Sequence, residues 1–456
     1  MRSARSMAPL RHRGFRLLAG GQLASNVGDA FYAVALPWYV LATHGGALLL
    51  AAVLAAYGVP RTALVVLGGH AADRWKPWTV MMGADTVRAL AVGALAVVAS
   101  LGPADASLLV PVAVVLGAGE GLFLPGSFAI VPSLLPDEDL QAGNALTSGG
   151  TQLATLVGPA LGGAVVAVAG PASAFGVDAV TFFVSALTLF GVRAHQRRPS
   201  SAPAATSVPA ATSASAPASA PAATSASVPE AATGGPGTAP VPAPTLRGLL
   251  ASERVLQVIL VVTVAANLGS GGLSEVALPA LAHGPFHAGA TGYGGLIAAF
   301  GGGALVGTLL SGQVRRARRP ALVASFAFLA EAGCIALVPY VGGALPAAAP
   351  LVAMGALNGF GNVVTITAFQ RWAPRALMGR LMGVVIVASL GIFPVSVVFG
   401  GAVVHSLGAA AFFPLSAGIL AIAVLGALTQ RSWRSFGATE DPAGVLQADL
   451  VAQGGG

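Results

Sequence analysis

Charged residues, lysine and cysteine are all scarce in this 456-residue sequence. Asp, Glu, Lys and Arg together make up 9% of the chain, whereas soluble domains carry about 25%. That scarcity excludes a soluble globular protein. The single lysine, Lys76, is followed by Pro77, so the Gly-Lys-Ser/Thr of a phosphate-binding loop is absent and an ATP-driven pump is excluded. The single cysteine, Cys334, excludes an intrachain disulfide and a thiolate metal cluster.

Histidines are few and scattered, which argues against catalysis and metal binding. A membrane enzyme would need a cluster of His, Asp or Glu at one membrane face, so it remains only an alternative, and no cofactor or catalytic residue is expected. His283 and His287 have metal-ligand spacing, but their loop has no third ligand, and no metal site is predicted. The basic residues cap loops rather than forming a basic helix. Membrane lipid is therefore an expected partner and nucleic acid is not.

Long hydrophobic runs dominate what is present. The chain is 55% hydrophobic, with a mean hydropathy of +0.80. Twelve stretches reach the roughly 20 residues that cross about 30 Å of hydrocarbon. Strand-like alternation is absent, so we predict an all-α polytopic membrane protein rather than a barrel. The predicted spans are 17–42, 47–69, 79–101, 108–131, 142–168, 172–192, 255–282, 291–312, 321–341, 347–370, 381–404 and 409–430.

Arginine and lysine occur only in every second loop between these stretches. Arg74 and Lys76 follow the second stretch, for example, whereas the turns at 43–46 and 102–106 hold neither residue. By the positive-inside rule, this alternation predicts that both termini are cytoplasmic. The composition, rich in Ala, Gly and Arg, is typical of a GC-rich bacterial genome, so we expect a multi-pass protein of a bacterial plasma membrane.

A change of composition divides the spans into two sets of six. Residues 199–244 are nearly all Ala, Pro, Ser, Thr and Gly, which leaves too little apolar surface to order the segment. We predict an N-terminal six-helix half at 1–195, a disordered cytoplasmic linker at 196–246, a C-terminal six-helix half at 247–435 and a flexible cytoplasmic tail at 436–456. Two six-span halves are typical of a secondary transporter.

The second stretch ends with a Gly-x-x-x-Asp-Arg pattern formed by Gly69, Asp73 and Arg74. Glycine permits close helix approach, and the charged pair can tie the loop to neighbouring helix ends. After the eighth stretch, Gly312 is followed by Arg315 where an acid would stand. The pattern resembles the loop 2–3 signature of the major facilitator superfamily. That resemblance implies that the three residues form a conformational latch, degenerate in the second copy.

The fifth stretch contains the motif Gly158, Pro159, Gly162 and Gly163. Proline kinks a helix and the glycines permit tight packing on a partner. Generic small-residue packing is the alternative in a chain with 61 glycines. The order of the motif, and the span that carries it, resemble the antiporter signature of exporters in this superfamily. The resemblance favours export over proton-coupled import.

Two further stretches, residues 15–29 and residues 131–136 with Asn144 and Gln152 beyond them, resemble the macrolide-efflux and siderophore-export permeases. This is a drug:proton antiporter branch of the superfamily. The resemblance spreads over most of both halves. It implies two helix bundles around a central cavity lined by spans one, four, seven and ten, and we expect the protein to work as a monomer.

Polar residues gather in those same four spans. Polar groups in apolar spans are costly and usually face a bundle interior or a cavity. We therefore expect a set of polar and aromatic side chains to contact a small-molecule substrate. The candidates are Gln22, Asn26 and Tyr32 in span one, Phe123 in span four, Asn267 in span seven, and Asn358 and Asn362 in span ten.

Three carboxylates in these spans are candidates for proton coupling. A low-dielectric cavity favours the neutral form of a carboxyl group, which can then bind and release a proton near neutral pH. Asp29, near mid-depth of span one, is the first candidate. Glu275 lies nearer the outer end of span seven and suits either a cationic substrate or a second protonation, and Glu120 suits either role. A hydrogen-bonded structural acid is the alternative for each.

The other charges within the spans are expected to be structural. Asp85 and Arg88 are three residues apart and can pair on one helix face, and Arg61 can pair or reach the interface. Asp178 and Glu331 belong to spans outside the expected lining. Span four lacks the arginine that many proton-coupled exporters carry there, which weakens the case for proton antiport. The sequence thus predicts a secondary exporter of amphipathic drugs, antibiotics or secondary metabolites in exchange for protons, with a proton-coupled importer as the alternative.

Overall fold

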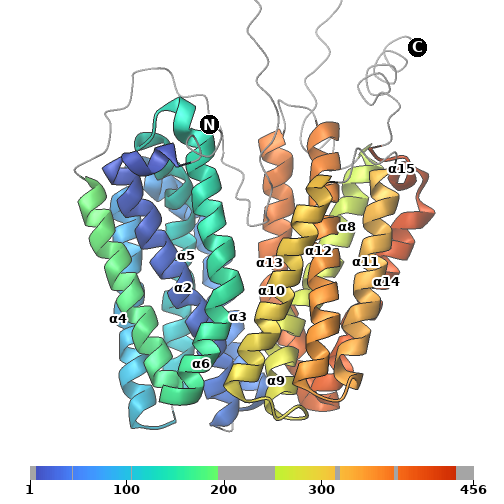
Figure 1. Ribbon diagram of the computed structural model, residues 1–456, viewed down its shortest axis with the longest axis horizontal. Coiled ribbons are helices and arrows are strands. Elements are labelled where there is room, and N and C mark those ends of the chain that lie inside the picture. Colours follow the sequence, from blue (N-terminus) through green and yellow to red (C-terminus); the bar gives the residue numbers. More distant parts are fainter. Residues whose placement is uncertain are drawn as a thin grey trace, which may run out of the picture.

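The computed structural model describes residues 7–43, 45–103, 105–193, 252–313, 319–373 and 378–437. Across these ranges the chain is almost entirely helical and contains no strand. Two bundles of long helices stand side by side, one from each half of the chain (Figure 1). The predicted fold class is therefore confirmed. The predicted linker and most of the predicted tail lie outside the described residues.

The described part of the N-terminal half consists of five long helices and two short 3-10 turns. The longest, α6, holds 56 residues, but Gly170 inside it has φ 79° and ψ 167°. That backbone conformation is open to glycine and breaks the helix, so α6 contains the predicted spans five and six. The elements are η1 (Ala8–Arg11), α2 (Arg13–Ala42), α3 (Gly46–Arg74), α4 (Pro77–Leu101), α5 (Ala106–Ile130), η2 (Val131–Ser133) and α6 (Asp137–Val192).

In the C-terminal half, the predicted span seven is built from three consecutive segments. An α-helix passes into a π-helical turn, η4, and returns to α-helix. The elements are α8 (Arg254–Gly272), η4 (Leu273–Ala277), α9 (Leu278–His283), α10 (Gly289–Gln313), α11 (Pro320–Leu337), η5 (Val338–Tyr340), α12 (Ala344–Trp372), α13 (Met378–Leu407), α14 (Ala409–Thr429) and α15 (Arg431–Arg434).

Ten helical segments in the described residues are long and apolar enough to cross a membrane. One of them, 138–192, contains both predicted spans five and six. Helix α2 is not among the ten although it is 30 residues long. Its polar residues, Gln22, Asn26 and Asp29 among them, lower its mean hydropathy. Each of the twelve predicted spans is thus matched by a helix.

The two halves repeat one close helix crossing. In the N-terminal half, α5 packs closely against α3 at Gly117 and Gly121. A side chain added at Gly117 would collide with the carbonyl oxygen of Tyr57, and one added at Gly121 would collide with that of Arg61. Small residues at such a crossing let two backbones approach closely. The crossing therefore fixes Glu120, which lies between the two glycines, against α3.

In the C-terminal half, α12 presses on α10 in the same way. Side chains added at Gly355 and Gly359 would collide with the carbonyl oxygens of Phe300 and Ala304. The two glycines have the same spacing as the pair in α5, with Asn358 in the place of Glu120. The two halves therefore resemble each other in helix packing as well as in the order of their spans.

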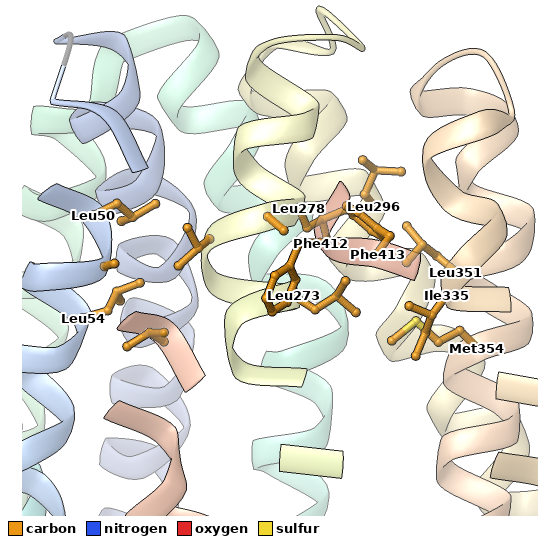
Figure 2. Close-up of a cluster of buried hydrophobic side chains, with 14 of the residues drawn as sticks. Leu50, Leu54, Leu273, Leu278, Leu296, Ile335, Leu351, Met354, Phe412 and Phe413 are labelled. Carbon is orange, nitrogen blue, oxygen red and sulfur yellow. The ribbon is translucent and has the colours of Figure 1, made fainter. Parts of the chain in front are cut away.

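Buried apolar side chains form a core that continues from one half into the other. Figure 2 shows Leu50 and Leu54 of α3 on one side, and Leu273 and Leu278 of the seventh span together with Phe412 of α14 on the other. Lipid is as apolar as these side chains, so close van der Waals packing, rather than removal from water, holds such helices together.

The halves meet toward the end of the molecule remote from α15 and from the start of α2 (Figure 1). There Trp38 of α2 lies with its ring centroid 5.0 Å from that of His283 in α9. Nearer the middle, the hydroxyl of Thr62 in α3 donates to the carbonyl oxygen of Leu390 in α13 at 3.2 Å. These contacts join the second and eleventh spans, and the first and seventh, across the two halves.

Candidate functional site

A cavity of about 260 Å³ lies where the two halves meet, near the middle of the helices. Most of its wall comes from helices α2 to α6, and the C-terminal half adds Glu275 and Phe393. Six of the lining residues are charged, and ionisable groups inside a membrane are by default candidates for function. The lining residues are Asp29, Tyr32, Ala33, Leu36, Pro37, Leu54, Tyr57, Arg61, Arg88, Leu116, Glu120, Asp178, Phe182, Glu275 and Phe393.

Arg88 of α4 links three helices at one side of the cavity. Its Nη2 donates to Oδ1 of Asp29 in α2 at 2.9 Å, and its Nη1 lies 3.5 Å from Oδ1 of Asp85. Its guanidinium also lies 3.9 Å from the ring centroid of Phe182 in α6. The planar, delocalised guanidinium suits this combination of carboxylate pairing and ring stacking. The expected pairing of Asp85 with Arg88 is thus present, and Arg88 also compensates the charge of Asp29.

The two partners differ in exposure. The side chain of Arg88 is 4% exposed, whereas that of Asp29 is 45% exposed. The carboxylate therefore faces the open space of the cavity while the guanidinium is packed behind it. A proton or a ligand entering the cavity reaches Asp29 before it reaches Arg88.

A second ion pair stands at the crossing of α3 and α5. The Nη2 of Arg61 lies 2.9 Å from Oε1 of Glu120, and the hydroxyl of Tyr57 donates to Oε2 of the same carboxylate. The guanidinium of Arg61 lies 5.8 Å from the ring centroid of Tyr57. Because Gly117 and Gly121 bring the two helices together, Glu120 meets both donors of α3.

Two carboxylates of the lining form no salt bridge within the described residues. Asp178 in α6 is 1% exposed and accepts a long hydrogen bond, 3.5 Å, from the hydroxyl of Thr181. Glu275 accepts one of 3.4 Å from the hydroxyl of Ser274. Glu275 lies on the π-helical turn η4, and such turns are frequent at functional sites. The lining therefore holds more carboxylates than guanidinium groups.

The structure brings four of the predicted site residues together. Asp29, Glu120 and Glu275, the candidates for proton coupling, all line the cavity, and so does Tyr32. The remaining predicted substrate contacts do not belong to its lining. They are Gln22, Asn26, Phe123, Asn267, Asn358 and Asn362.

Several of these residues are occupied by contacts within their own half. Asn26 donates to the hydroxyl of Thr151 in α6 at 3.1 Å. Asn267 donates to the carbonyl oxygen of Thr263, one turn earlier in α8, at 2.8 Å. Phe123 packs beside the apolar cluster at the start of α2, and Gln22 is half-buried in α2. Asn358 and Asn362 belong to a separate polar group on α12.

The motif of the fifth span packs between α2 and α10. Gly158 and Gly162 face α2, where added side chains would meet Ala30 and Phe31. Gly163 and the carbonyl oxygen of Pro159 face α10 in the other half. The motif therefore lies at the interface between the halves.

The three residues of the expected latch lie at the end of α3. Arg74 is the last residue of the helix and is exposed. The surroundings of Gly69 and the side chain of Asp73 lie outside the described part of the chain, as does the degenerate copy at Arg315.

Sequence reasoning missed that Arg61, Arg88 and Asp178 face the cavity. All three are charges inside apolar spans, which was the available signal, but their helices lay outside the expected lining. The guanidinium groups come from α3 and α4, the second and third spans. The cavity therefore contains cationic groups although span four has no arginine.

Comparison with known proteins gives one family and several relatives. A family model described as transmembrane secretion effector matches residues 4–216. The multidrug efflux pump Tap of Mycolicibacterium fortuitum is 30% identical over 183 residues, which are 39% of this chain and 44% of that pump. The enterobactin exporter EntS of Citrobacter koseri is 26% identical over 333 residues, covering 70% of this chain and 68% of the exporter. The match to Tap thus spans less than half of either protein.

The fold is shared with solved transporter structures. The POT family transporter PepTSo aligns with a TM-score of 0.66 at 12% identity, covering 92% of this chain and 98% of that one. At this identity the likeness concerns the fold alone. The relatives named above are an efflux pump and an exporter.

Proposed function

We propose that this major facilitator superfamily permease exports amphipathic small molecules, such as drugs, antibiotics or secondary metabolites, in exchange for protons. The observation that carries the proposal is the cavity in which Asp29 and Glu120 are each paired with a guanidinium group at 2.9 Å. The names of two relatives, a multidrug efflux pump and an enterobactin exporter, support the direction of transport. So does the small-residue motif of α6 at the interface between the halves.

Proton coupling would act through the bond between Arg88 and Asp29. A proton bound by Asp29 removes the negative charge that holds Arg88, whose remaining carboxylate partner is Asp85 at 3.5 Å. Because an unpaired buried charge is costly, the guanidinium then shifts toward Asp85 and loosens the link between α2 and α4. Proton binding at the cavity wall is thereby converted into a change in helix packing.

Substrate selection would follow from the excess of carboxylates. Both guanidinium groups are already paired, so an anionic substrate would have to displace Asp29 or Glu120. A cationic substrate finds Asp178 and Glu275 without salt-bridge partners, beside the aromatic rings of Tyr32 and Phe393. Rings of this kind attract cations. Pockets for small molecules measure about 300–1,000 Å³, so the cavity of about 260 Å³ would have to widen to bind a larger substrate.

Alternating access would be a rocking of one half against the other around this cavity. With both termini in the cytoplasm, the contacts of α2 with α9 and of α6 with α10 lie toward the outer face. The conformation is then one in which the outer side is closed. The protein would work as a monomer in the plasma membrane, because the cavity is complete within a single chain.

Everted membrane vesicles with an acidic interior test the export proposal. Addition of macrolides, cationic dyes or siderophore-like compounds should release protons from wild-type vesicles. The variant Asp29→Asn should take up less of the compound and release no protons. Proton release by Asp29→Asn equal to wild type would remove Asp29 from the coupling mechanism, with Glu120→Gln and Glu275→Gln tested next. Compound leaving the vesicles together with protons would instead indicate an importer.

A further inference from the structure

Glu331 is a buried carboxyl group of the C-terminal half that lies outside the central cavity. It stands on α11 and is 4% exposed. Its Oε1 accepts a hydrogen bond of 2.9 Å from the side-chain amide of Asn358 in α12. Its Oε2 is buried and has no hydrogen-bond partner in the described part of the chain. One oxygen of the carboxyl group is therefore left without a partner.

Within the described residues, no positive charge faces Glu331 from the helices packed around it. Helices α12 and α14 pack on α11, and their only ionisable side chain is Arg371, at the far end of α12. On α11 itself the neighbouring titratable group is Cys334, which is uncharged as a thiol. The short helix α15 brings its arginines only to the end of the bundle, where Arg431 and Arg434 are exposed. An ionised Glu331 would therefore be an uncompensated charge among apolar helices, which a membrane protein avoids.

The repeat between the halves gives this position a counterpart. Tyr57 and Phe300 are separated by the same number of residues as Arg61 and Ala304. Pro77 and Pro320, the first residues of α4 and α11, have this separation too. The same spacing takes Arg88 to position 331. Glu331 thus occupies the place in its half that Arg88 holds in the N-terminal half, while Asn358 occupies the place of Glu120.

A polar face of α12 leads away from Glu331. Asn362 donates to Oδ1 of Asn358 at 3.0 Å, and the hydroxyl of Thr365 is buried without a partner in the described residues. Asn358, Asn362 and Thr365 are four and three residues apart, so they lie on one face of the helix. The face runs toward the end of α12 at Trp372, which packs against Phe436 near α15.

We propose that Glu331 is a proton-binding site of the C-terminal half, separate from the central cavity and reached along the polar face of α12. A proton on Oε2 makes the group neutral, as its surroundings require. Release of that proton places a negative charge where the other half has Arg88, and so weakens the packing of α11 on α12. The site needs no substrate to bind its proton, so it can be tested independently of the export proposal.

Infrared difference spectroscopy of the purified full-length protein in lipid nanodiscs tests this site. Spectra taken at acidic and alkaline pH should differ by the C=O band of a protonated carboxyl group in an apolar environment. Glu331→Gln keeps the size and the hydrogen bond of the side chain, and subtracting its difference spectrum from that of the wild type should leave the band of Glu331. The bands of the cavity carboxyl groups Asp29, Glu120, Asp178 and Glu275 cancel in this subtraction. In Asn358→Leu the band should persist but shift to higher frequency, since the hydrogen bond to Oε1 is removed. The exposed Glu138→Gln should leave it unchanged.

Any of three results would overturn the proposal. A spectrum of Glu331→Gln identical to wild type would mean that Glu331 does not exchange a proton in this pH range. Loss of the band at constant pH, when sodium chloride replaces choline chloride, would mean that the site binds a metal cation rather than a proton. If Glu331→Gln does not fold, the frequency shift in Asn358→Leu decides, and an unshifted band there would count against Glu331.

Discussion

Arg88 and Asp29 form a 2.9 Å ion pair between α4 and α2 at the wall of the cavity. The guanidinium is also held by Asp85 and by the ring of Phe182, so it has a fixed position from which it orients Asp29. The carboxylate is the more exposed partner. This asymmetry places the carboxylate, rather than the guanidinium group, at the surface of the cavity.

We expect Arg88→Gln to be the most damaging single change in this pair. It leaves Asp85 and Asp29 without their cation, and removal of one member of a buried pair costs about 3–5 kcal/mol. The amount of folded protein and its thermal stability in detergent should both fall. The double variant Asp29→Asn, Arg88→Gln should recover part of this stability, because one of the two uncompensated charges is gone. Arg254→Gln, at an exposed position at the start of α8, is the matched control.

No recovery in the double variant would contradict this account. It would mean that Arg88 stabilises the fold through Asp85 and Phe182 alone, and that its bond to Asp29 contributes nothing.

Tyr57→Phe should alter the behaviour of Glu120 without disturbing the fold. The change removes only the hydroxyl that donates to Glu120, and hydrogen bonds to charged groups contribute about 1.5–3 kcal/mol. Loss of a donor to the carboxylate makes its protonation easier. The pH profile of cationic-dye export should therefore move toward higher pH, by about one unit for 1.4 kcal/mol. Tyr340→Phe, at a residue that is 69% exposed, should leave the profile in place, and an unmoved profile in Tyr57→Phe would exclude Glu120 from proton coupling.

The sequence was sufficient to predict the helical fold, because each apolar run is long enough to need a helix in a membrane. It also singled out Asp29, Glu120 and Glu275, since carboxylates are rare in such runs. The direction in which a side chain points was harder to predict, because it depends on how each helix is rotated against its neighbours. Arg88 and Asp178 were placed outside the lining for a different reason, because α4 and α6 were not among the spans expected to reach the cavity.

Asn358 is the opposite case, a residue that was expected to line the cavity and does not. It lies in a span that was expected to line the cavity, and its polarity favoured that position. Yet Gly355 and Gly359 set the crossing of α12 with α10, and the residue between them turns toward Glu331 of α11. This contact depends on how three helices pack together, so it cannot be predicted from the polar pattern of one helix.

Gly163→Val should shift the protein away from the conformation in which we propose that the outer side is closed. Gly163 lies against the backbone of Ala290 in the other half, where even a Cβ atom would come within 2.5 Å of the carbonyl oxygen. A branched side chain must push the halves apart there. In a Cys334→Ser background, Ala33→Cys in the cavity wall should become more reactive toward a membrane-impermeant maleimide added from outside. Gly176→Val, at a position with open space around it, should not change this labelling, and equal labelling in both variants would show that the crossing does not control access.

Removal of residues 205–236 should leave export intact. The two halves are held together by contacts between helices such as α3 with α13, so the linker needs only to span the distance between them. The composition of residues 199–244 predicts a flexible chain. Such a chain reaches about 5–6 Å × √n, which would give roughly 35–40 Å for its 46 residues and about 20 Å for the shortened segment. Dye export per molecule of inserted protein should stay within about twofold of wild type, whereas deletion of the whole segment 196–246 should abolish it by tying the halves together. Loss of export in the shorter deletion, with normal insertion and thermal stability, would show that the linker sequence itself takes part in transport.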